Sequence, residues 1–202
     1  MKLFTVAVFL MSAIAHAAAP VKIEAGKYNI DSAHTKVGFE ISHLVISTVD
    51  GRFEQYSGEV EMGKAITDTK IDATLQVASL TTGNADRDKH LKSPDFFDAA
   101  KFPTITFKST KITGSAGALK VTGDLTIHGV TKPVTLESKY MGVVNDPYGN
   151  NKIAFTAKGK ISRKDFGLTW NKAIEAGPVV GDEVTLLLNV EAGKPIAKTA
   201  GK

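Results

Sequence analysis

The side chains best suited to metal binding or proton transfer, beyond the first twenty residues, are four histidines: His34, His43, His90 and His128. No two of them are four residues apart, and no carboxylate motif of a metal site accompanies them. The alternative is that they lie in loops or at strand ends and form local hydrogen bonds. The 202-residue chain contains no cysteine, which excludes thiolate metal sites, cysteine nucleophiles and disulfides. We therefore expect no metal site.

Motifs of the common catalytic sites are missing. The sequence contains no G-x-S-x-G, H-E-x-x-H, G-x-G-x-x-G or P-loop pattern. Charge is close to balanced, with 25 lysines and arginines against 21 acidic residues, and the lysines are dispersed along the chain. This distribution argues against a nucleic-acid-binding surface. We expect neither catalysis nor a cofactor, and a secreted enzyme on a barrel scaffold is the alternative.

Two basic segments could bind an anionic head group such as a diphosphate. Arg87, Lys89 and His90 belong to the first segment, and Arg163 and Lys164 to the second. Such cations form charge-assisted hydrogen bonds with phosphate or carboxylate groups. The alternative is that they pair with neighbouring carboxylates and hold their own loops in place. The sequence leaves both interpretations open.

The elements that must position these residues are strands. Apolar and polar residues alternate through most of the chain, as in Val37, Phe39 and Ile41, and this period of two is typical of strands with one apolar face. We predict eight strands at roughly 27–41, 49–62, 70–80, 103–113, 118–127, 132–144, 151–162 and 182–192. Eight antiparallel strands of this kind bury their apolar faces by closing into an up-and-down barrel. The predicted fold class is all-β.

Strand order predicts which connections meet. Alternate connections of a meander lie at the same end, so residues 42–48, 81–102, the turn at His128 and residues 163–181 gather at one end, the mouth. Short turns close the other end, the foot. The segment near 84–98 is predicted to be helical, with Asn84 as its cap and a second short helix from Ser93-Pro94. Candidate head-group or mouth residues are His43, Arg87, Lys89, His90, His128, Arg163, Lys164, Phe166 and Trp170. The two aromatic residues of that set either line the entrance or pack beneath it.

The apolar faces of the strands predict the interior of the barrel. The inward residues, and hence the candidate ligand-binding residues, are Val37, Phe39, Ile41, Phe53, Leu75, Val77, Ile105, Phe107, Leu125, Ile127, Phe155, Leu186 and Leu188. Small residues of the same parity, Ala73, Gly123, Ala157 and Gly159, leave space for an alkyl or prenyl chain. The alternative is an interior filled completely by side chains. A further alternative is an outer-membrane barrel, which would turn its apolar face outward. Such barrels carry two girdles of aromatic residues, and the aromatic residues of this sequence do not form them.

The first residues are predicted to be a signal peptide. Lys2 precedes an apolar run from Leu3 to Ile14, and Ala15-His16-Ala17 is a small-x-small cleavage pattern. About 12 apolar residues are too few for a transmembrane helix, which needs roughly 20. We expect a signal peptide at 1–17, a barrel domain at 18–193 and a C-terminal tail at 194–202. The mature protein would be periplasmic or secreted.

Motifs spread from Tyr28 to Glu191 resemble those of the YceI-like polyisoprenoid-binding family, which has a lipocalin-like barrel. The matching segments are Tyr28-x-Ile30-Asp31-x-x-His34-Thr35-x-Val37-x-Phe39, Gly51-x-Phe53, Arg87-Asp88-x-His90-Leu91, Asp95-Phe96-Phe97, Phe102-Pro103-x-Ile105-x-Phe107, Gly123-x-Leu125-Thr126-Ile127-x-Gly129-Val130-Thr131-x-Pro133-Val134, Arg163-x-Asp165-Phe166-Gly167 and Gly181-Asp182-x-Val184. Thr35 replaces the family's usual serine, and Tyr28 its frequent tryptophan. The resemblance implies an exported carrier, often a homodimer, that holds an isoprenoid or another long amphiphile, such as a polyprenyl or quinone-type molecule.

Processing gives the first testable prediction. Cleavage after Ala17 should leave Ala18 as the mature N-terminus, because a cut after Ala19 would place Pro20 directly after the broken bond. The intact mass of the protein isolated from the periplasm measures this. A mass that still includes residues 1–17 would contradict the export interpretation.

Overall fold

The computed structural model describes residues 22–174 and 177–196. The predicted signal peptide and its cleavage site lie outside these residues. The strands are β1 (Gly26–Ile30), β2 (Lys36–His43), β3 (Ser47–Phe53), β4 (Tyr56–Met62), β5 (Lys70–Gln76), β6 (Leu80–Thr81), β7 (Thr104–Ser115), β8 (Ala118–Ile127), β9 (Val130–Asn145), β10 (Asn150–Ser162), β11 (Ala173–Ile174), β12 (Gly177–Pro178) and β13 (Val180–Pro195). The helices are α1 (Ala85–Leu91) and the 3₁₀ turns η1 (Ile66–Asp68), η2 (Val77–Ser79) and η3 (Arg163–Phe166).

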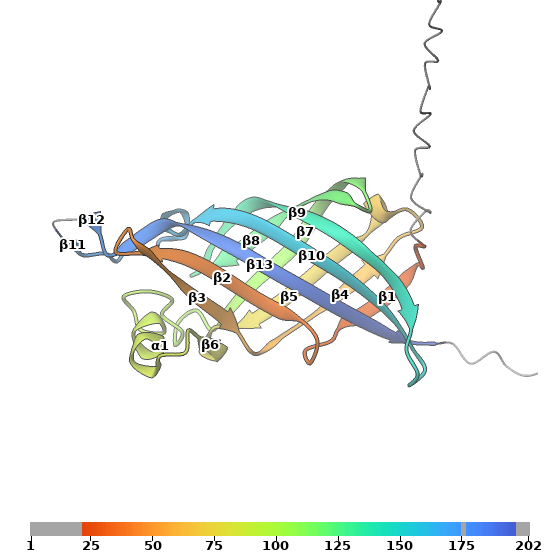
Figure 1. Cartoon of the computed structure of the whole chain (residues 1–202), viewed down its shortest axis with the longest axis horizontal. Coiled ribbons are helices and arrows are strands. Elements are labelled where there is room, and N and C mark those ends of the chain that lie inside the picture. Colours follow the sequence, from red (N-terminus) through yellow and green to blue (C-terminus); the bar gives the residue numbers. More distant parts are fainter. Residues whose placement is uncertain (1–21, 175–176, 197–202) are drawn as a thin grey trace, which may run out of the picture.

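The main sheet is a closed antiparallel barrel, as predicted (Figure 1). Its hydrogen-bonded order is β1-β4-β5-β7-β8-β9-β10-β13-β2-β3-β6, and β1 also pairs with β13. Three of the eight barrel strands are interrupted, so that β1 and β2 form one, β3 and β4 the next, and β5 and β6 the third. Each barrel strand then pairs with its neighbours in the chain, and β13 closes the circle. β13 continues to Pro195, three residues beyond the predicted strand end.

A turn at residues 31–35 breaks the first barrel strand. The Asp31 carboxylate accepts a hydrogen bond from the Ala33 amide (3.0 Å), and the Asp31 carbonyl accepts one from the Thr35 amide (3.0 Å). The Thr35 hydroxyl then replaces the missing strand backbone: it donates to the Glu191 carbonyl at 3.0 Å and accepts from the Glu191 amide at 2.9 Å. β13 therefore stays hydrogen-bonded across the break. The alternation pattern predicted one continuous strand here and did not predict the break.

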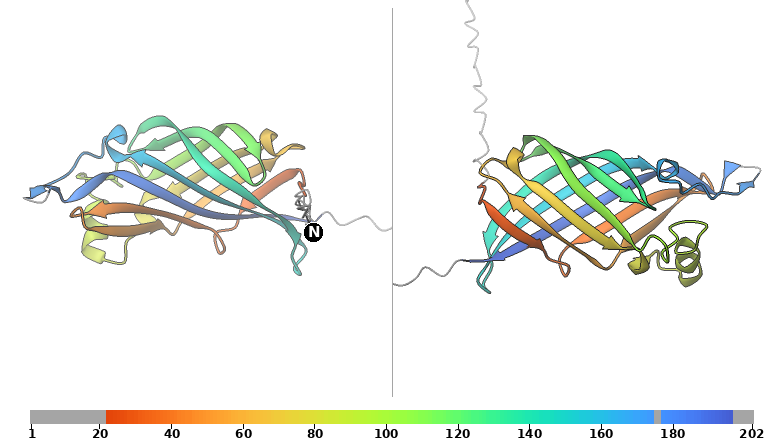
Figure 2. Two further views of the ribbon diagram at one scale, coloured as in Figure 1. Left: turned by 45° about the horizontal axis from the view of Figure 1, so that its top comes forward. Right: turned by 180° about the vertical axis from the view of Figure 1, so that it is seen from behind.

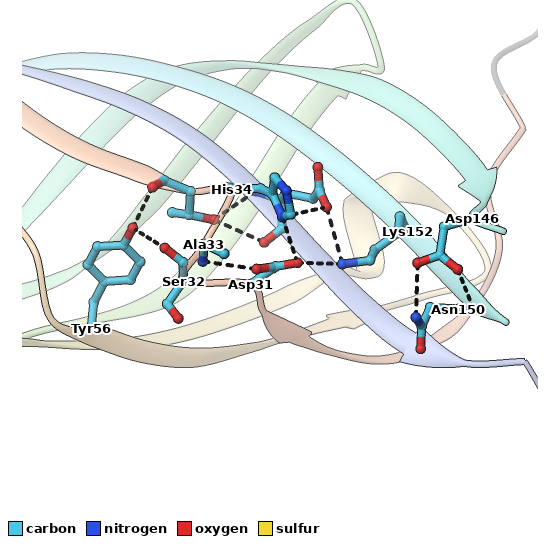
Figure 3. A network of polar contacts seen from close by, with 10 residues as sticks. Asp31, Ser32, Ala33, His34, Tyr56, Asp146, Asn150 and Lys152 are labelled. Atoms are coloured by element: carbon cyan, nitrogen blue, oxygen red, sulfur yellow. Dashed lines mark hydrogen bonds and ion pairs between the residues drawn. The ribbon is translucent and has the colours of Figure 1, made fainter. Parts of the chain in front are cut away.

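An ion-pair cluster fastens this turn to β10 and β13 (Figure 3). Lys152 Nζ lies 2.5 Å from Asp31 Oδ2 and 3.2 Å from Glu191 Oε1, and His34 Nδ1 lies 3.1 Å from the same Asp31 oxygen. The hydrogen bond from Lys152 lowers the pKa of Asp31 well below its usual value, and the same bond raises the pKa of Lys152. Because the Asp31 and Lys152 side chains are only 20% and 18% exposed, solvent screens this pair less than an ordinary surface ion pair.

The foot of the barrel is packed solid. A cluster of buried side chains there includes Tyr28, Val60, Tyr140 and Phe155, and the rings of Tyr140 and Phe155 are 5.0 Å apart. Tyr28 is fully buried; its hydroxyl donates to Asn151 Oδ1 at 2.5 Å, and burial raises its pKa to about 12. These contacts fill the interior at this end of the barrel.

The helix at the mouth is shorter than predicted. Asn84 caps α1 by accepting a hydrogen bond from the Arg87 amide at 3.0 Å, as expected. The second helix predicted from Ser93 is wrong: the backbone forms successive turns, and Asp98 has a φ of 45°, which a regular helix does not allow. None of the helices in residues 22–174 and 177–196 is long and apolar enough to cross a membrane.

The ion-pair cluster gives a stability prediction. Asp31→Asn should lower the free energy of unfolding at pH 7 by about 1.5–3 kcal/mol, because it removes a charge-assisted hydrogen bond. The folded-state pKa of Asp31 is lowered, so its contribution is complete above the ordinary Asp pKa of about 3.9 and is lost as pH falls through the folded value. Urea unfolding between pH 7 and pH 2.5 should show the gap to wild type narrowing below about pH 4.

The matched control is Asp50→Asn, which changes an exposed carboxylate on β3. It should leave the unfolding curve within about 0.5 kcal/mol of wild type. A gap between wild type and Asp31→Asn that stayed constant down to pH 2.5 would show that the ion pair is not its source.

Candidate functional site

The barrel contains one large cavity of about 590 Å³, with a wall that is almost entirely apolar. It lies between the packed foot and the mouth. Twelve of the thirteen predicted interior residues line it: Val37, Phe39, Ile41, Phe53, Leu75, Ile105, Phe107, Leu125, Ile127, Phe155, Leu186 and Leu188. The volume is in the range of about 300–1,000 Å³ found for small-molecule sites. Of the two interiors that the sequence left open, the structure has the hollow one.

Val77 is the exception, and its prediction as a lining residue is wrong. β5 ends at Gln76, and Val77 begins the 3₁₀ turn η2, where its amide donates to the Pro103 carbonyl at 2.9 Å. The turn interrupts the alternation of the strand. Val77 is consequently buried in the apolar cluster around the cavity rather than on the cavity wall.

Further wall residues were missed. Ile71, Val121, Leu136, Val184 and Val190 face the cavity, and the same alternation could have identified them. Leu91, at the end of α1, and the loop residues Phe96 and Leu168 also line the cavity, but no strand period reaches them.

The small residues divide into two pairs. Ala73 and Ala157 line the cavity. Gly123 and Gly159 do not, because neighbouring side chains cover them: an added Cβ would lie 2.5 Å from Phe107 Cζ at Gly123 and 2.5 Å from Leu136 Cδ2 at Gly159. The glycines therefore accommodate wall side chains, and only the alanines leave space in the cavity itself.

Three aromatic rings meet at the mouth, one from α1, one from the turns that follow it and one from the loop after η3. His90, Phe96 and Trp170 lie with ring centroids 5.0–5.1 Å apart, and all three line the cavity. The Nε2 atom of His90 is 2.9 Å from Asp95 Oδ2. Figure 2 shows α1 and the β11–β12 hairpin at this same end of the barrel. The predicted convergence of these loops is therefore observed, and Trp170 has the entrance position.

Arg163 holds the second loop together. Its guanidinium is buried and donates to the carbonyls of Gly181 (2.7 Å), Leu168 (2.5 Å) and Trp170 (2.8 Å) and to Asp182 Oδ1 (3.2 Å). Burial lowers its pKa, and Asp182 opposes that change. Phe166, from the same turn, is buried and contributes to the cavity wall. Most of the donors of Arg163 are already used, so the loop-holding interpretation is the one that its contacts support.

Arg87 has local partners but remains at the cavity. Its Nε and Nη2 atoms donate to the hydroxyl (2.7 Å) and carbonyl (3.0 Å) of Thr82, and Asp88 accepts from the same hydroxyl. The sequence allowed Arg87 to pair with a neighbouring carboxylate, but in the structure its guanidinium binds Thr82 instead. Arg87, His90 and His43 line the mouth of the cavity.

Three predicted mouth residues do not line the cavity. Lys89 is exposed on α1, Lys164 pairs with Asp182 at 2.7 Å, and the ring of His128 packs at 4.4 Å from that of Phe102. Strand parity places a loop at an end of the barrel, but it does not decide which side of that loop faces inward.

Potential metal ligands come together away from the mouth. In the part of the chain that the structure describes, Asp31, His34 and Glu191 each offer a ligand atom within 4.8 Å of the others. The Lys152 amine already lies against both carboxylates, where a cation would bind. This cluster is therefore an ion-pair network of the fold.

The model of the YceI-like domain matches residues 28–192. Protein YceI of Salmonella newport is 42% identical over 170 residues, which cover 83% of this chain and 86% of that protein. The crystal structure of the Campylobacter jejuni YCEI protein matches with a TM-score of 0.64 and 39% identity, covering 81% of this chain and 95% of that one. A polyisoprenoid binding domain from Saccharophagus degradans, at 16% identity and a TM-score of 0.59, covers 83% of this chain and 98% of its own and has the same fold.

The contacts of Arg163 give a prediction that separates a structural role from ligand binding. Arg163→Ala should lower the free energy of unfolding by about 2–5 kcal/mol, because buried carbonyls lose their donors. Arg163→Lys should recover only part of this, since an ammonium group cannot reproduce the planar fork. Lys164→Ala is the control, because it shares Asp182 but is exposed, and it should cost less than about 1 kcal/mol. Urea unfolding measures all three, and an unchanged stability of Arg163→Ala would contradict the loop-holding role.

Proposed function

This chain belongs to the YceI-like domain family, and from that premise we propose that its barrel binds the apolar chain of an isoprenoid or another long-chain amphiphilic lipid. The observation that carries the proposal is the cavity of about 590 Å³, closed by the packed foot and lined almost entirely by hydrocarbon. The Saccharophagus degradans domain, which has the same fold, is a polyisoprenoid binding domain.

The chemistry of the wall favours an apolar chain over a polar metabolite. Each methylene transferred from water to such a wall contributes about 0.8 kcal/mol. A polar group in the same place would lose its hydrogen bonds to water and find few partners. The cavity wall is almost entirely apolar, so it presents few hydrogen-bonding groups to such a ligand.

The polar end of the ligand would lie at the mouth. Four titratable side chains among the predicted mouth residues line the cavity: Arg87, His90, His43 and Arg163. Most of the donors of Arg163 already bind the loop, which leaves Arg87, His90 and His43 for a head group. A phosphate or carboxylate head group would bind there by charge-assisted hydrogen bonds. The aromatic rings of Phe96 and Trp170 would cover the first part of the apolar chain.

We propose a carrier that acts outside the cytoplasm. The signal-peptide pattern supports the location. The hydrocarbon wall supports binding rather than catalysis, because the histidine side chains that line the cavity, His43 and His90, lie at its mouth and not along the apolar wall.

Filling the cavity tests the proposal. Ala157 lines the cavity on β10, so Ala157→Phe should place a ring in the space of the ligand and reduce the co-purified lipid severalfold. Gly159 is the poorer site for this test, because a side chain there would collide with Leu136. Lipids extracted from the purified protein are quantified by mass spectrometry, with circular dichroism as the measure of folding.

The matched control is Thr156→Phe, one residue away, because successive side chains of a strand point to opposite faces. It should keep the lipid content of wild type. Equal lipid content in folded Ala157→Phe and wild type would place the ligand elsewhere and overturn the proposal.

A further inference from the structure

An exposed aliphatic tip projects from the rim of the mouth. The turn between β2 and β3 contains Leu44, Val45 and Ile46, which we call the rim tip. Val45 is 62% exposed and Ile46 is 87% exposed. The turn contains no lysine, arginine or carboxylate. The residues on either side, His43 before it and Ser47 and Thr48 after it, add none either. Two large aliphatic side chains are therefore presented side by side to solvent.

The fold holds the rim tip in this outward conformation. The Leu44 amide donates to the Val179 carbonyl (2.9 Å), and the Ile46 amide donates to the His43 carbonyl (3.3 Å). Leu44 and Val45 have φ values of 53° and 67°. This left-handed region is unfavourable for a β-branched residue and persists only where the surrounding contacts impose it. The exposure of Val45 and Ile46 is thus a property of the folded backbone.

The rim tip is continuous with the cavity. His43 and Val179, which bond to its backbone, both line the cavity wall, as do Ser42 and Val180. Figure 1 shows the β2–β3 turn at the same end of the barrel as α1 and the β11–β12 hairpin. A chain that leaves the cavity at this edge would pass directly along the tip.

The backbone of an exposed lysine, Lys172, pairs with the residue that binds the rim tip. The Val179 amide donates to the Lys172 carbonyl at 3.0 Å, and the Val179 carbonyl accepts from the Leu44 amide. Val179 therefore lies between the backbones of Lys172 and Leu44. The Lys172 residue is exposed. An aliphatic pair next to a lysine is suited to the interface of an anionic bilayer, where the apolar groups insert and the cation meets the head groups.

We propose that the rim tip docks the mouth of the barrel on the surface of an anionic phospholipid bilayer. Two exposed aliphatic side chains supply only a small part of the area of at least about 1,000 Å² that a stable protein interface buries. Insertion into a bilayer needs no such area, because each buried methylene contributes by itself. This inference rests on the proposed function for its purpose, which is to let a lipid pass between membrane and cavity without crossing water.

The test uses single-cysteine labels, which the absence of cysteine from the chain makes site-specific. Ile46→Cys and, at the opposite end of the barrel, Val144→Cys carry an environment-sensitive fluorophore. Val144 is a matched control because it is 65% exposed near the β9–β10 turn of the foot. Vesicles of phosphatidylglycerol and phosphatidylethanolamine should raise and blue-shift the emission at residue 46 and leave residue 144 unchanged. Vesicles of phosphatidylcholine alone should give a weaker response at residue 46.

A second experiment removes the aliphatic groups. Val45→Asp with Ile46→Asp should weaken sedimentation with the anionic vesicles by about tenfold, while Val144→Asp should leave it unchanged. Equal responses of the two labels, or no response at residue 46, would overturn the docking proposal. So would a residue 46 signal that depends on protein concentration without vesicles, because that would indicate a second copy of the chain. Lipid content is measured on the same wild-type protein, and an empty barrel would count against the proposed function, whatever the labels show.

Discussion

The barrel depends on one joint, where β13 crosses from one half of a broken strand to the other. β1 and β2 both pair with β13, but the turn at residues 31–35 lies between them. The Thr35 hydroxyl supplies the missing donor and acceptor to Glu191, and Asp31 and Lys152 form an ion pair across the joint. Without these contacts, the first and last strands would lose part of their pairing, and an open edge would replace the closed wall.

The interior is filled at the foot and open towards the mouth. At the foot, the fully buried Tyr28 packs with Val60 and Met62 of β4. Nearer the mouth, the cavity wall is made of aliphatic and phenylalanine side chains. Several of them, such as Val37, Phe39 and Leu186, are only half-buried, because they face the cavity instead of one another. An apolar chain that fills this space would bury the same surface that the protein leaves uncovered.

The mouth combines two segments, each held together by local contacts of its charged side chains. Arg163 organises the loop that carries Trp170, and His90 with Asp95 organises the segment after α1. The aromatic contacts between Trp170, His90 and Phe96 then join the two loops. The rim tip lies outside this paired region, and its apolar side chains face solvent. The proposed membrane contact and the proposed ligand site are thus adjacent parts of one surface.

Local alternation and chain order determined most of this architecture. The period of two identified the strands and twelve wall residues, and the order of strands placed the long loops at one end, since both follow from backbone geometry. Three features depended on contacts between distant segments. Val77 does not line the cavity, because it lies in a turn whose amide binds the Pro103 carbonyl. Gly159 is covered by Leu136. Arg163 has a structural role, because it donates to the carbonyls of Gly181 and Trp170. A sequence period specifies which face of a strand is apolar, but only tertiary packing decides whether a side chain on that face meets a neighbour, a carbonyl group or empty space.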